Sequence, residues 1–418
     1  MRILYLHQFF VTREGSGGTR SYEFARHLVG AGHEVVMVTA GSEGNRIVDG
    51  IRVVEVRGGY VDYVRATSMA YPRRIASFFR FAAQATSAVL REPAPNVVFA
   101  TSPPLTMALP AIAAARRHRA PLVFEVRDLW PEAPIQMGAL RNPAARRVAR
   151  ALEWAVYRTS AHVVALSPGI REGVIAAGVA PAGVTLIPNA SDLDLFSPDL
   201  DGRAVREQLG LEGRFLCSYF GTMGEANDLS QVIEAATLLQ GQGDESVAFV
   251  LQGDGKRRAG LEEDVRRRGL CNVLFLPAGD KSSAARLAAA SDACMTIFKD
   301  VPILATNSPN KLFDTFAAGR PAIVNTAGWQ RDLVERHEAG LSPDRAIPRT
   351  WPSRCSRCAT TRRRRQPTGA MRAGWPRARS TAGCSGSGCG SCSRTWPPGG
   401  ITRDRGGALL LRGQHERT

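Results

Sequence analysis

Residues 215–240, FLCSYFGTMGEANDLSQVIEAATLLQ, decide the fold of this 418-residue chain. An apolar run of strand length, FLCSYFG, is followed by a loop and then by DLSQVIEAATLLQ, in which apolar residues recur at helical spacing. Units of this kind build parallel sheets that are covered by helices. Further apolar runs at 246–254, 272–278, 292–298 and 321–325 alternate with helical patterns, so this part of the chain is predicted to be one doubly wound α/β domain.

The same alternation occurs earlier in the chain. Apolar runs lie at 2–10, 33–40, 96–102, 121–128, 162–167 and 184–189. The run at 215 therefore begins a second series, after the connecting segment NASDLDLFSPD at 189–199. We predict two doubly wound, Rossmann-like α/β domains, residues 1–185 and an incomplete 186–343, that face a cleft. Ligands of such sheets bind at the carboxyl ends of the strands.

Residues 344–418 have a different composition. They hold 16 arginines, no lysine and three acids, a net charge of +13, which leaves only +3 of the chain's +16 for the first 343 residues. Valine, phenylalanine and tyrosine are absent, and such a segment buries too little apolar surface to offset its chain entropy. We interpret it as a disordered basic tail. Without lysines and interleaved aromatic residues it does not indicate a nucleic-acid partner.

Two cysteine pairs in this tail, Cys355-x-x-Cys358 and Cys389-x-x-Cys392, have the form of a four-thiolate zinc site. The loop between the pairs is longer than the usual spacing, and no strand pattern surrounds them. Arginine, cysteine, tryptophan, proline and glycine without lysine are also what a GC-rich reading frame gives when it is translated out of register. We therefore favour a frameshift at about residues 341–345. Another frame after the codon for Leu341 should then encode an amphipathic helical continuation, and the idea fails if none does.

The other cysteines, Cys217, Cys271 and Cys294, lie in apolar stretches, as thiols of a reducing compartment do. No targeting peptide is evident, because His7 and Gln8 interrupt the first apolar run. The longest apolar run, at 103–115, is too short to span a bilayer. We expect a cytoplasmic protein that is at most peripheral to the inner face of a membrane.

Residues 308–321, SPNKLFDTFAAGRP, place charges of both signs in an apolar stretch. Ser308 suits an N-cap and Pro309 a first helical position, so a helix is predicted whose amide dipoles point into the cleft. Lys311 in its first turn is placed to hold a phosphate, and Asp314, on the same face, to accept hydrogen bonds from a ribose diol. A nucleoside diphosphate carries both groups. The alternative is an ordinary i,i+3 ion pair on a surface helix.

Two loops of the first domain also follow predicted strands. In VTREGSGGTR, at 11–20, glycines before a helix let backbone amides approach an anion, although Arg20 replaces the third glycine of the dinucleotide fingerprint. A simple turn is the alternative. In DLWPE, at 128–132, Asp128 and Glu132 are placed to accept a proton or to bind sugar hydroxyls. Alternatively, Asp128 caps the next turn and Glu132 is solvated.

Seven motifs together resemble a known family. They are GGTRSYEFARHLVGAGHEVVMVT, TSPPL, VRDLWPE, LIPNASDLDLFSP, YFGTMGEANDL, LQGDGKRRAGLEE and SPNKLFDTFAAGRP. Their order and spacing resemble family 4 retaining glycosyltransferases of GT-B architecture, over residues 1 to about 341. The branch most similar builds bacterial O-antigen, capsule and colanic-acid-type repeats. The resemblance implies transfer of a sugar from a UDP-sugar or other nucleotide-diphosphate donor to a lipid-linked or saccharide acceptor.

The resemblance also implies roles for single residues. Asp128, Glu132 and Lys311 form the catalytic set, in which Lys311 neutralises the departing diphosphate. Retaining transfer of this class is thought to need little protein nucleophile, because the departing phosphate accepts the proton of the incoming hydroxyl, so neither a metal nor a cofactor is expected. The donor-binding residues carried over are Gly17, Gly18, Gly221, Gly253, Lys256, Asn310, Lys311 and Asp314.

Three positions depart from the family's pattern. Thr306 stands where many members have the first of two glutamates, TMGEAND replaces a loop that commonly carries Arg and Lys, and Arg127 replaces a common His. The groups that stabilise the leaving group therefore stay open at this point.

Residues 71–90, YPRRIASFFRFAAQATSAVL, have the pattern of a basic amphipathic helix. Such a helix can rest on an anionic membrane, where a polyprenyl-linked acceptor would lie. The alternative is a domain helix packed by the same apolar stripe. That stripe consists of Ile75, Phe78, Phe79, Ala82 and Val89.

Two other functions remain as alternatives. A nucleotide-sugar 2-epimerase-like enzyme of the same fold would need further acids and histidines in the cleft, which the motifs do not supply. The second alternative is an inactive relative of the family, because the tail replaces the segment that completes the second domain in the family.

Overall fold

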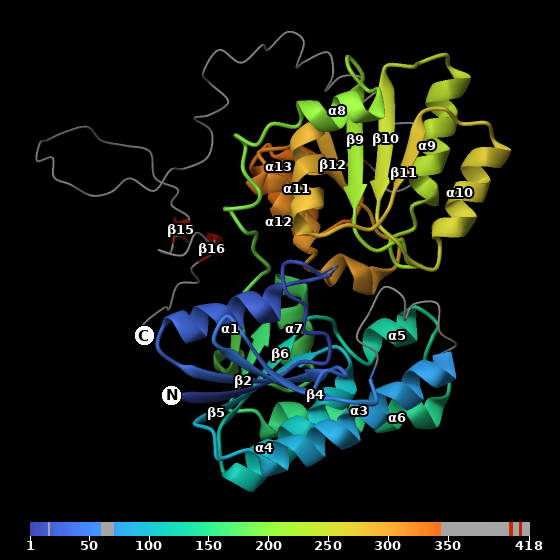
Figure 1. The fold of residues 1–418 in the computed structure, drawn as a ribbon. Helices are drawn as coiled ribbons and strands as arrows, with labels where there is room; N and C mark the ends of the chain where they lie inside the picture. Colours follow the sequence, from blue (N-terminus) through green and yellow to red (C-terminus); the bar gives the residue numbers. More distant parts are fainter. Residues whose placement is uncertain (16, 60–70, 344–400, 404–408, 412–418) are drawn as a thin grey trace, which may run out of the picture.

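The computed structural model describes residues 1–15, 17–59, 71–343, 401–403 and 409–411. Residues 1–15, 17–59 and 71–343 form two α/β domains, one above the other (Figure 1). Within the tail, β15 (Ile401–Arg403) and β16 (Leu409–Leu411) pair with each other in antiparallel fashion. The predicted disorder, the paired cysteines and the frameshift otherwise fall on residues outside the described ranges. The two doubly wound domains predicted from the strand pattern are confirmed.

The first domain is built on an eight-stranded sheet in the order β3-β4-β2-β1-β5-β6-β7-β8. Every pairing is parallel except the hairpin of β3 and β4. The chain order reverses between β1 and β5, which opens a crevice at their carboxyl ends. The strands are β1 (Arg2–Leu6), β2 (Glu34–Ala40), β3 (Asn45–Val48), β4 (Ile51–Val56), β5 (Val97–Ser102), β6 (Leu122–Val126), β7 (His162–Ala165) and β8 (Val184–Leu186).

The β3–β4 hairpin is absent from the sequence prediction. Asp49 and Gly50, which join the two strands, both have positive φ, at 48° and 78°. Asp-Gly is the sequence signal of such a two-residue turn, so the hairpin was recognisable from residues 49–50. The predicted domain boundary at 185 lies within β8 (Val184–Leu186).

Helices cover both faces of the first sheet (Figure 1). The apolar stripe of α3 largely packs inward: Phe78 is 5%, Ala82 1% and Val89 0% exposed, whereas Phe79 is 50% exposed. The alternative of a packed domain helix thus describes most of this stripe. Among the described residues, no helix has both the length and the apolar character of a membrane span. The helices are α1 (Arg20–Gly30), α3 (Tyr71–Arg91), η1 (Leu105–Met107), α4 (Ala108–His118), α5 (Glu132–Gln136), α6 (Pro143–Thr159), α7 (Pro168–Ala176) and η2 (Pro181–Gly183).

The second domain has a six-stranded, fully parallel sheet in the order β11-β10-β9-β12-β13-β14. Its order reverses between β9 and β12, which opens a second crevice at the carboxyl ends of these strands. The strands are β9 (Phe215–Phe220), β10 (Val247–Gln252), β11 (Val273–Leu276), β12 (Ala293–Thr296), β13 (Ala322–Val324) and β14 (Gly340–Leu341). The helices are α8 (Arg203–Leu209), α9 (Ser230–Gly241), α10 (Arg258–Arg267), α11 (Lys281–Ala290), η3 (Pro302–Thr306), α12 (Asn310–Ala317) and α13 (Trp329–Arg336).

Arg20, the residue that replaces the third fingerprint glycine, fastens the connecting segment to the first domain. Its side chain is almost wholly buried and pairs with the Glu125 carboxylate at 2.9 Å. It also donates to the carbonyls of Ile187 at 2.8 Å and Pro188 at 2.7 Å. A glycine at position 20 could not make these contacts, which hold the connection between the two domains in place.

Candidate functional site

A cavity of about 1680 Å³ lies between the carboxyl ends of the two sheets. The loops after β1, β6, β9 and β10 and the first turn of α12 all contribute to its wall. The structure thus brings together nearly all the residues singled out from the sequence. Those that line the cavity are Gly17, Gly18, Asp128, Gly221, Gly253, Lys256, Asn310, Lys311 and Asp314.

Helix α12 begins one residue later than predicted. Pro309 has an extended conformation, with φ −76° and ψ 128°, and is itself the N-cap, without a side-chain cap. Ser308 is not the cap because it is buried against Asn189, whose side-chain amide donates to the Ser308 carbonyl. Lys311 still lies in the first turn, where the helix dipole favours an anion.

Among the described residues, the ammonium of Lys311 has no counter-ion. Its Nζ donates to the Tyr219 hydroxyl at 2.7 Å, and in the part of the chain that the structure describes no carboxylate lies within ion-pair distance of it. By exposed area Lys311 as a whole is half-buried, but its ammonium is enclosed, and this loss of water lowers its pKa to about 7. An enclosed cation of this kind favours an anionic ligand.

Two glycines let the neighbouring loops close over Lys311. Gly253 has φ 147°, and a Cβ there would lie 1.9 Å from the carbonyl oxygen of Gly221. A Cβ on Gly221 would in turn lie 3.3 Å from the Lys311 Nζ. A side chain at Gly253 would therefore force the loops after β9 and β10 apart.

Asp314 is 5% exposed and accepts a hydrogen bond from the Ser191 hydroxyl at 2.7 Å. Burial raises the pKa of its carboxyl to about 6, while the charge of Lys281 and the hydrogen bond from Ser191 act in the opposite direction. No ion pair joins Asp314 to Lys311 among the described residues, so the alternative of an exposed i,i+3 pair does not hold. Both side chains are instead available to a ligand in the cavity.

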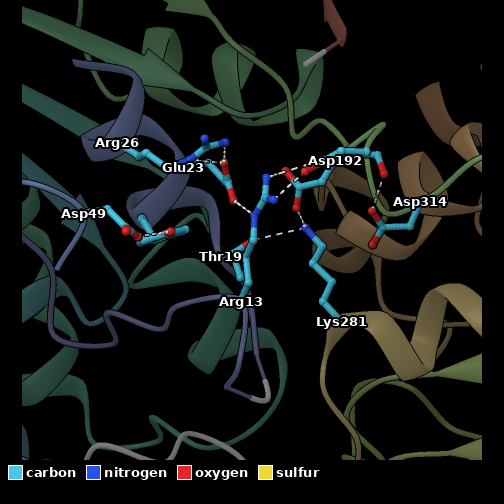
Figure 2. Close-up of polar contacts among 11 residues, drawn as sticks. Arg13, Thr19, Glu23, Arg26, Asp49, Asp192, Lys281 and Asp314 are labelled. Atoms are coloured by element: carbon cyan, nitrogen blue, oxygen red, sulfur yellow. Dashed lines mark hydrogen bonds and ion pairs between the residues drawn. The ribbon is translucent and has the colours of Figure 1, made fainter. Parts of the chain in front are cut away.

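Ionic contacts around Asp192 join the two domains next to this site (Figure 2). Lys281, the first residue of α11, pairs with Asp192 of the connecting segment and donates to the Thr19 hydroxyl at 3.1 Å. On the other side of Asp192, the guanidinium of Arg13 approaches its carboxylate at 3.5 Å. No role for Lys281 was predicted from the sequence. Its signal was Asp280, which caps α11 by accepting from the Ser283 amide at 2.7 Å.

Asp128 and Glu132 do not share one environment. Asp128 lines the cavity, and burial raises the pKa of its carboxyl while the charge of Arg127 opposes that rise. Glu132 does not line the cavity: it accepts from the Gln136 amide at 2.9 Å and pairs with Arg150 at 3.6 Å on the surface. The expected place of Glu132 in the cleft is therefore wrong, because its position at the start of α5 directs it to α6.

Lys256 lies at the exposed rim of the cavity and pairs with Glu225 at 3.7 Å. The opposite end of the cavity is apolar. It is formed by α3, α5 and α6 and opens to the surface at Phe79 and Val148, which are 50% and 67% exposed. The apolar lining includes Phe78, Phe79, Met137, Leu140, Val148 and Leu152.

Two doubly wound domains that face a shared cleft define the GT-B fold, and solved structures agree. Anabaena HepE, solved in complex with UDP-glucose, superposes with a TM-score of 0.64 at 19% identity and covers 87% of this chain and 91% of its own. WaaG, a glycosyltransferase involved in lipopolysaccharide biosynthesis, superposes with a TM-score of 0.64 at 16% identity, covering 86% and 90%. These similarities confirm the predicted fold.

Sequence comparison adds a family. Residues 15–190 match the model of the glycosyl transferase 4-like domain, so the first domain carries this family's sequence pattern. WcaI of Escherichia coli K12, named as a colanic acid biosynthesis glycosyl transferase, is 29% identical over 262 residues, 61% of this chain and 62% of that protein. The glycosyltransferase EpsF of Bacillus subtilis 168 is 28% identical over 165 residues, 38% of each chain. The chain thus matches less than two thirds of either relative's length. The resemblance to GT-B glycosyltransferases is confirmed.

Proposed function

We propose that this protein is a retaining glycosyltransferase that transfers a sugar from a UDP-sugar, or another nucleotide-diphosphate sugar, without a metal ion. The product would belong to a bacterial surface polysaccharide. The observation that carries the proposal is the enclosed, unneutralised ammonium of Lys311 in the first turn of α12, beside the buried carboxylate of Asp314. This pair offers a cation to a diphosphate and an acceptor to a ribose diol.

In the proposed reaction these charges act on the departing diphosphate. The bond between the anomeric carbon and the β-phosphate oxygen breaks, and its electron pair stays on the phosphate. The acceptor hydroxyl forms the new bond to the anomeric carbon on the same face and gives its proton to that phosphate. Lys311 and the amides of the first turn of α12 stabilise the growing negative charge, and closure of the domains excludes water.

The apolar end of the cavity supports a lipid-linked acceptor. Phe79 on α3 and Val148 on α6 both line the cavity and are both largely exposed. Arg73 and Arg80 are exposed on α3, and Trp154, 57% exposed, adds an aromatic side chain on α6. Basic and aromatic side chains of this kind favour the interface of an anionic membrane. We infer that the protein works at the cytoplasmic face of the membrane, with the saccharide in the cleft and its polyprenyl chain towards α3 and α6.

Calorimetric titration with UDP- and GDP-sugars, UDP-glucose among them, tests the donor site. The wild-type protein should bind one nucleotide class, and Lys311→Ala should weaken that binding at least tenfold because a charge-assisted contact is lost. Lys299→Ala is the matched control, since Lys299 is an exposed lysine of the same domain that does not line the cavity. Equal affinity in the wild type and Lys311→Ala would contradict the proposed phosphate site.

A further inference from the structure

Arg127, at the carboxyl end of β6, is a second cation that has no acidic partner among the described residues, and it lies next to the cavity-lining Gly18. It is half-buried, and no carboxylate of the described residues lies within 4.0 Å of its guanidinium. Its hydrogen-bond contact is between Nη1 and the Nε2 atom of His7, at 3.4 Å. A partly desolvated arginine without an acidic partner is costly unless an anion binds to it.

His7 holds this guanidinium in place. The ring is 1% exposed, and its Nδ1 lies 2.8 Å from the Ser21 hydroxyl. Burial, and after it the positive charge of Arg127, hold the pKa of His7 well below its ordinary value, so the ring is neutral. A neutral imidazole has one acceptor nitrogen. With Nε2 as that acceptor for Arg127, Nδ1 carries the proton and donates to Ser21.

The other end of the guanidinium reaches the glycine loop. A Cβ added to Gly18 would lie 3.2 Å from Nη2 of Arg127 and 3.1 Å from Nδ2 of Asn310. Arg127 of the first domain and Asn310 of the second therefore approach the same point beside Gly18. Asn310 is the first residue of α12 and immediately precedes Lys311, so Arg127 lies beside the start of the helix that carries the proposed phosphate-binding lysine.

We propose that Arg127 binds the diphosphate of the nucleotide sugar from the side of the first domain, with His7 as its positioning residue. This inference depends on the proposed donor site. The guanidinium supplies positive charge that the TMGEAND loop lacks, and its planar donors suit two phosphate oxygens. Because the contact comes from the opposite domain, a bound diphosphate also draws the two domains together.

The decisive experiment is calorimetry with UDP and UMP, or with GDP and GMP if the wild type prefers guanine. Arg127→Gln should weaken UDP binding about 10- to 100-fold but UMP binding less than about 3-fold, since the β-phosphate contact is lost. The affinity of Arg127→Lys for UDP should lie between those of Arg127→Gln and the wild type, because lysine keeps the charge but lacks the planar guanidinium. Arg203→Gln is the control and should match the wild type for both nucleotides, because Arg203 is 83% exposed and does not line the cavity.

The outcomes separate the two proposals. If the wild type binds UDP and Arg127→Gln binds it equally well, the role of Arg127 is refuted and the donor site stands. Equal losses for UDP and UMP, or a loss that only follows a lowered melting temperature, would show a structural role and also overturn the inference. If the wild type binds neither UDP nor GDP, both proposals fall.

The positioning role of His7 has its own test. His7→Gln keeps an acceptor for Arg127 and should retain UDP affinity within about threefold. His7→Leu removes the acceptor and should weaken the binding of UDP more than the binding of UMP. Equal affinities for UDP in the two variants would refute the positioning role.

Discussion

The ammonium of Lys311 lies 3.9 Å from the centroid of the Tyr219 ring and donates to its hydroxyl at 2.7 Å. The Tyr219 hydroxyl in turn donates to the carbonyl of Thr222 at 2.6 Å, which fixes its lone pairs towards Lys311. The ligand-free cation is thus held by a ring face and one neutral oxygen. These contacts orient Lys311 but leave its charge for a ligand to neutralise.

Lys311 should destabilise the ligand-free protein below pH 7. Its pKa is about 7 in the folded state against an ordinary 10.5, so it is charged in both states at lower pH and the burial cost is fully present. As the pH rises from about 7 towards 10.5, the folded state loses this proton first and the cost disappears. Lys311→Met should therefore raise the free energy of unfolding by on the order of 2 kcal/mol at pH 6.5 and by much less at pH 9.5.

Urea denaturation at both pH values measures this difference. Lys256→Met is the matched control: Lys256 is exposed, so its replacement should change stability equally at the two pH values. A pH dependence of Lys311→Met that equals that of the wild type would show that Lys311 is not the titrating group.

Asp314 should show the opposite dependence on pH. Burial raises the pKa of its carboxyl from 3.8 to about 6, so the folded state holds the proton more tightly, and stability falls as the pH rises from about 4 to 6. Asp314→Asn keeps an acceptor for Ser191 and removes the buried charge. It should raise the free energy of unfolding by about 1–2 kcal/mol at pH 7.5 and weaken nucleotide binding about tenfold.

Denaturation and calorimetry on the same preparation check the two effects together. At pH 4 the stability advantage of Asp314→Asn should vanish, since Asp314 is then protonated in the folded state. A variant that is less stable than the wild type at pH 7.5, or that binds UDP with unchanged affinity, would refute this account.

The sequence predicts the parts of the site that lie within one strand–loop–helix unit. Lys311 and Asp314 are placed by the start of α12, and Gly221 and Gly253 by the ends of β9 and β10. In each case the neighbouring residues along the chain determine where the group lies. Local pattern is therefore sufficient to place these four residues.

Contacts between distant units are not predicted. Arg20 is noticed in the sequence only as a missing glycine, because its partner Glu125 is 105 residues away and the carbonyls that it binds are further still. The cap Asp280 marks only the start of the helix at Lys281, because the pairing of Lys281 with Asp192 exists only once the connecting segment has folded. For α3, periodicity reveals an apolar stripe but not that the domain core covers Phe78 and Val89.

The loss of Arg20 alone should destabilise the fold more than the loss of Arg20 and Glu125 together. Arg20→Met leaves the Glu125 carboxylate buried without a cation, which should cost about 3 kcal/mol or more of unfolding free energy. Arg20→Met combined with Glu125→Leu removes both charges and should cost clearly less. Urea denaturation of the three proteins measures this. A double variant no more stable than Arg20→Met would mean that the hydrogen bonds of Arg20 to the connecting segment, and not the charge, dominate.

The contact of Lys281 with Asp192 should couple the domains more strongly than a surface ion pair does. The two side chains are 13% and 8% exposed, whereas those of Arg203 and Asp201, a pair within the second domain, are 83% and 58% exposed. A double-mutant cycle with Lys281→Met and Asp192→Asn should give a coupling energy above about 1 kcal/mol. The same cycle with Arg203→Met and Asp201→Asn should give a clearly smaller coupling energy. Because water and salt screen only the exposed pair, 1 M NaCl should reduce the second coupling and leave most of the first. Equal couplings in the two cycles would show that Asp192 does not join the domains through Lys281.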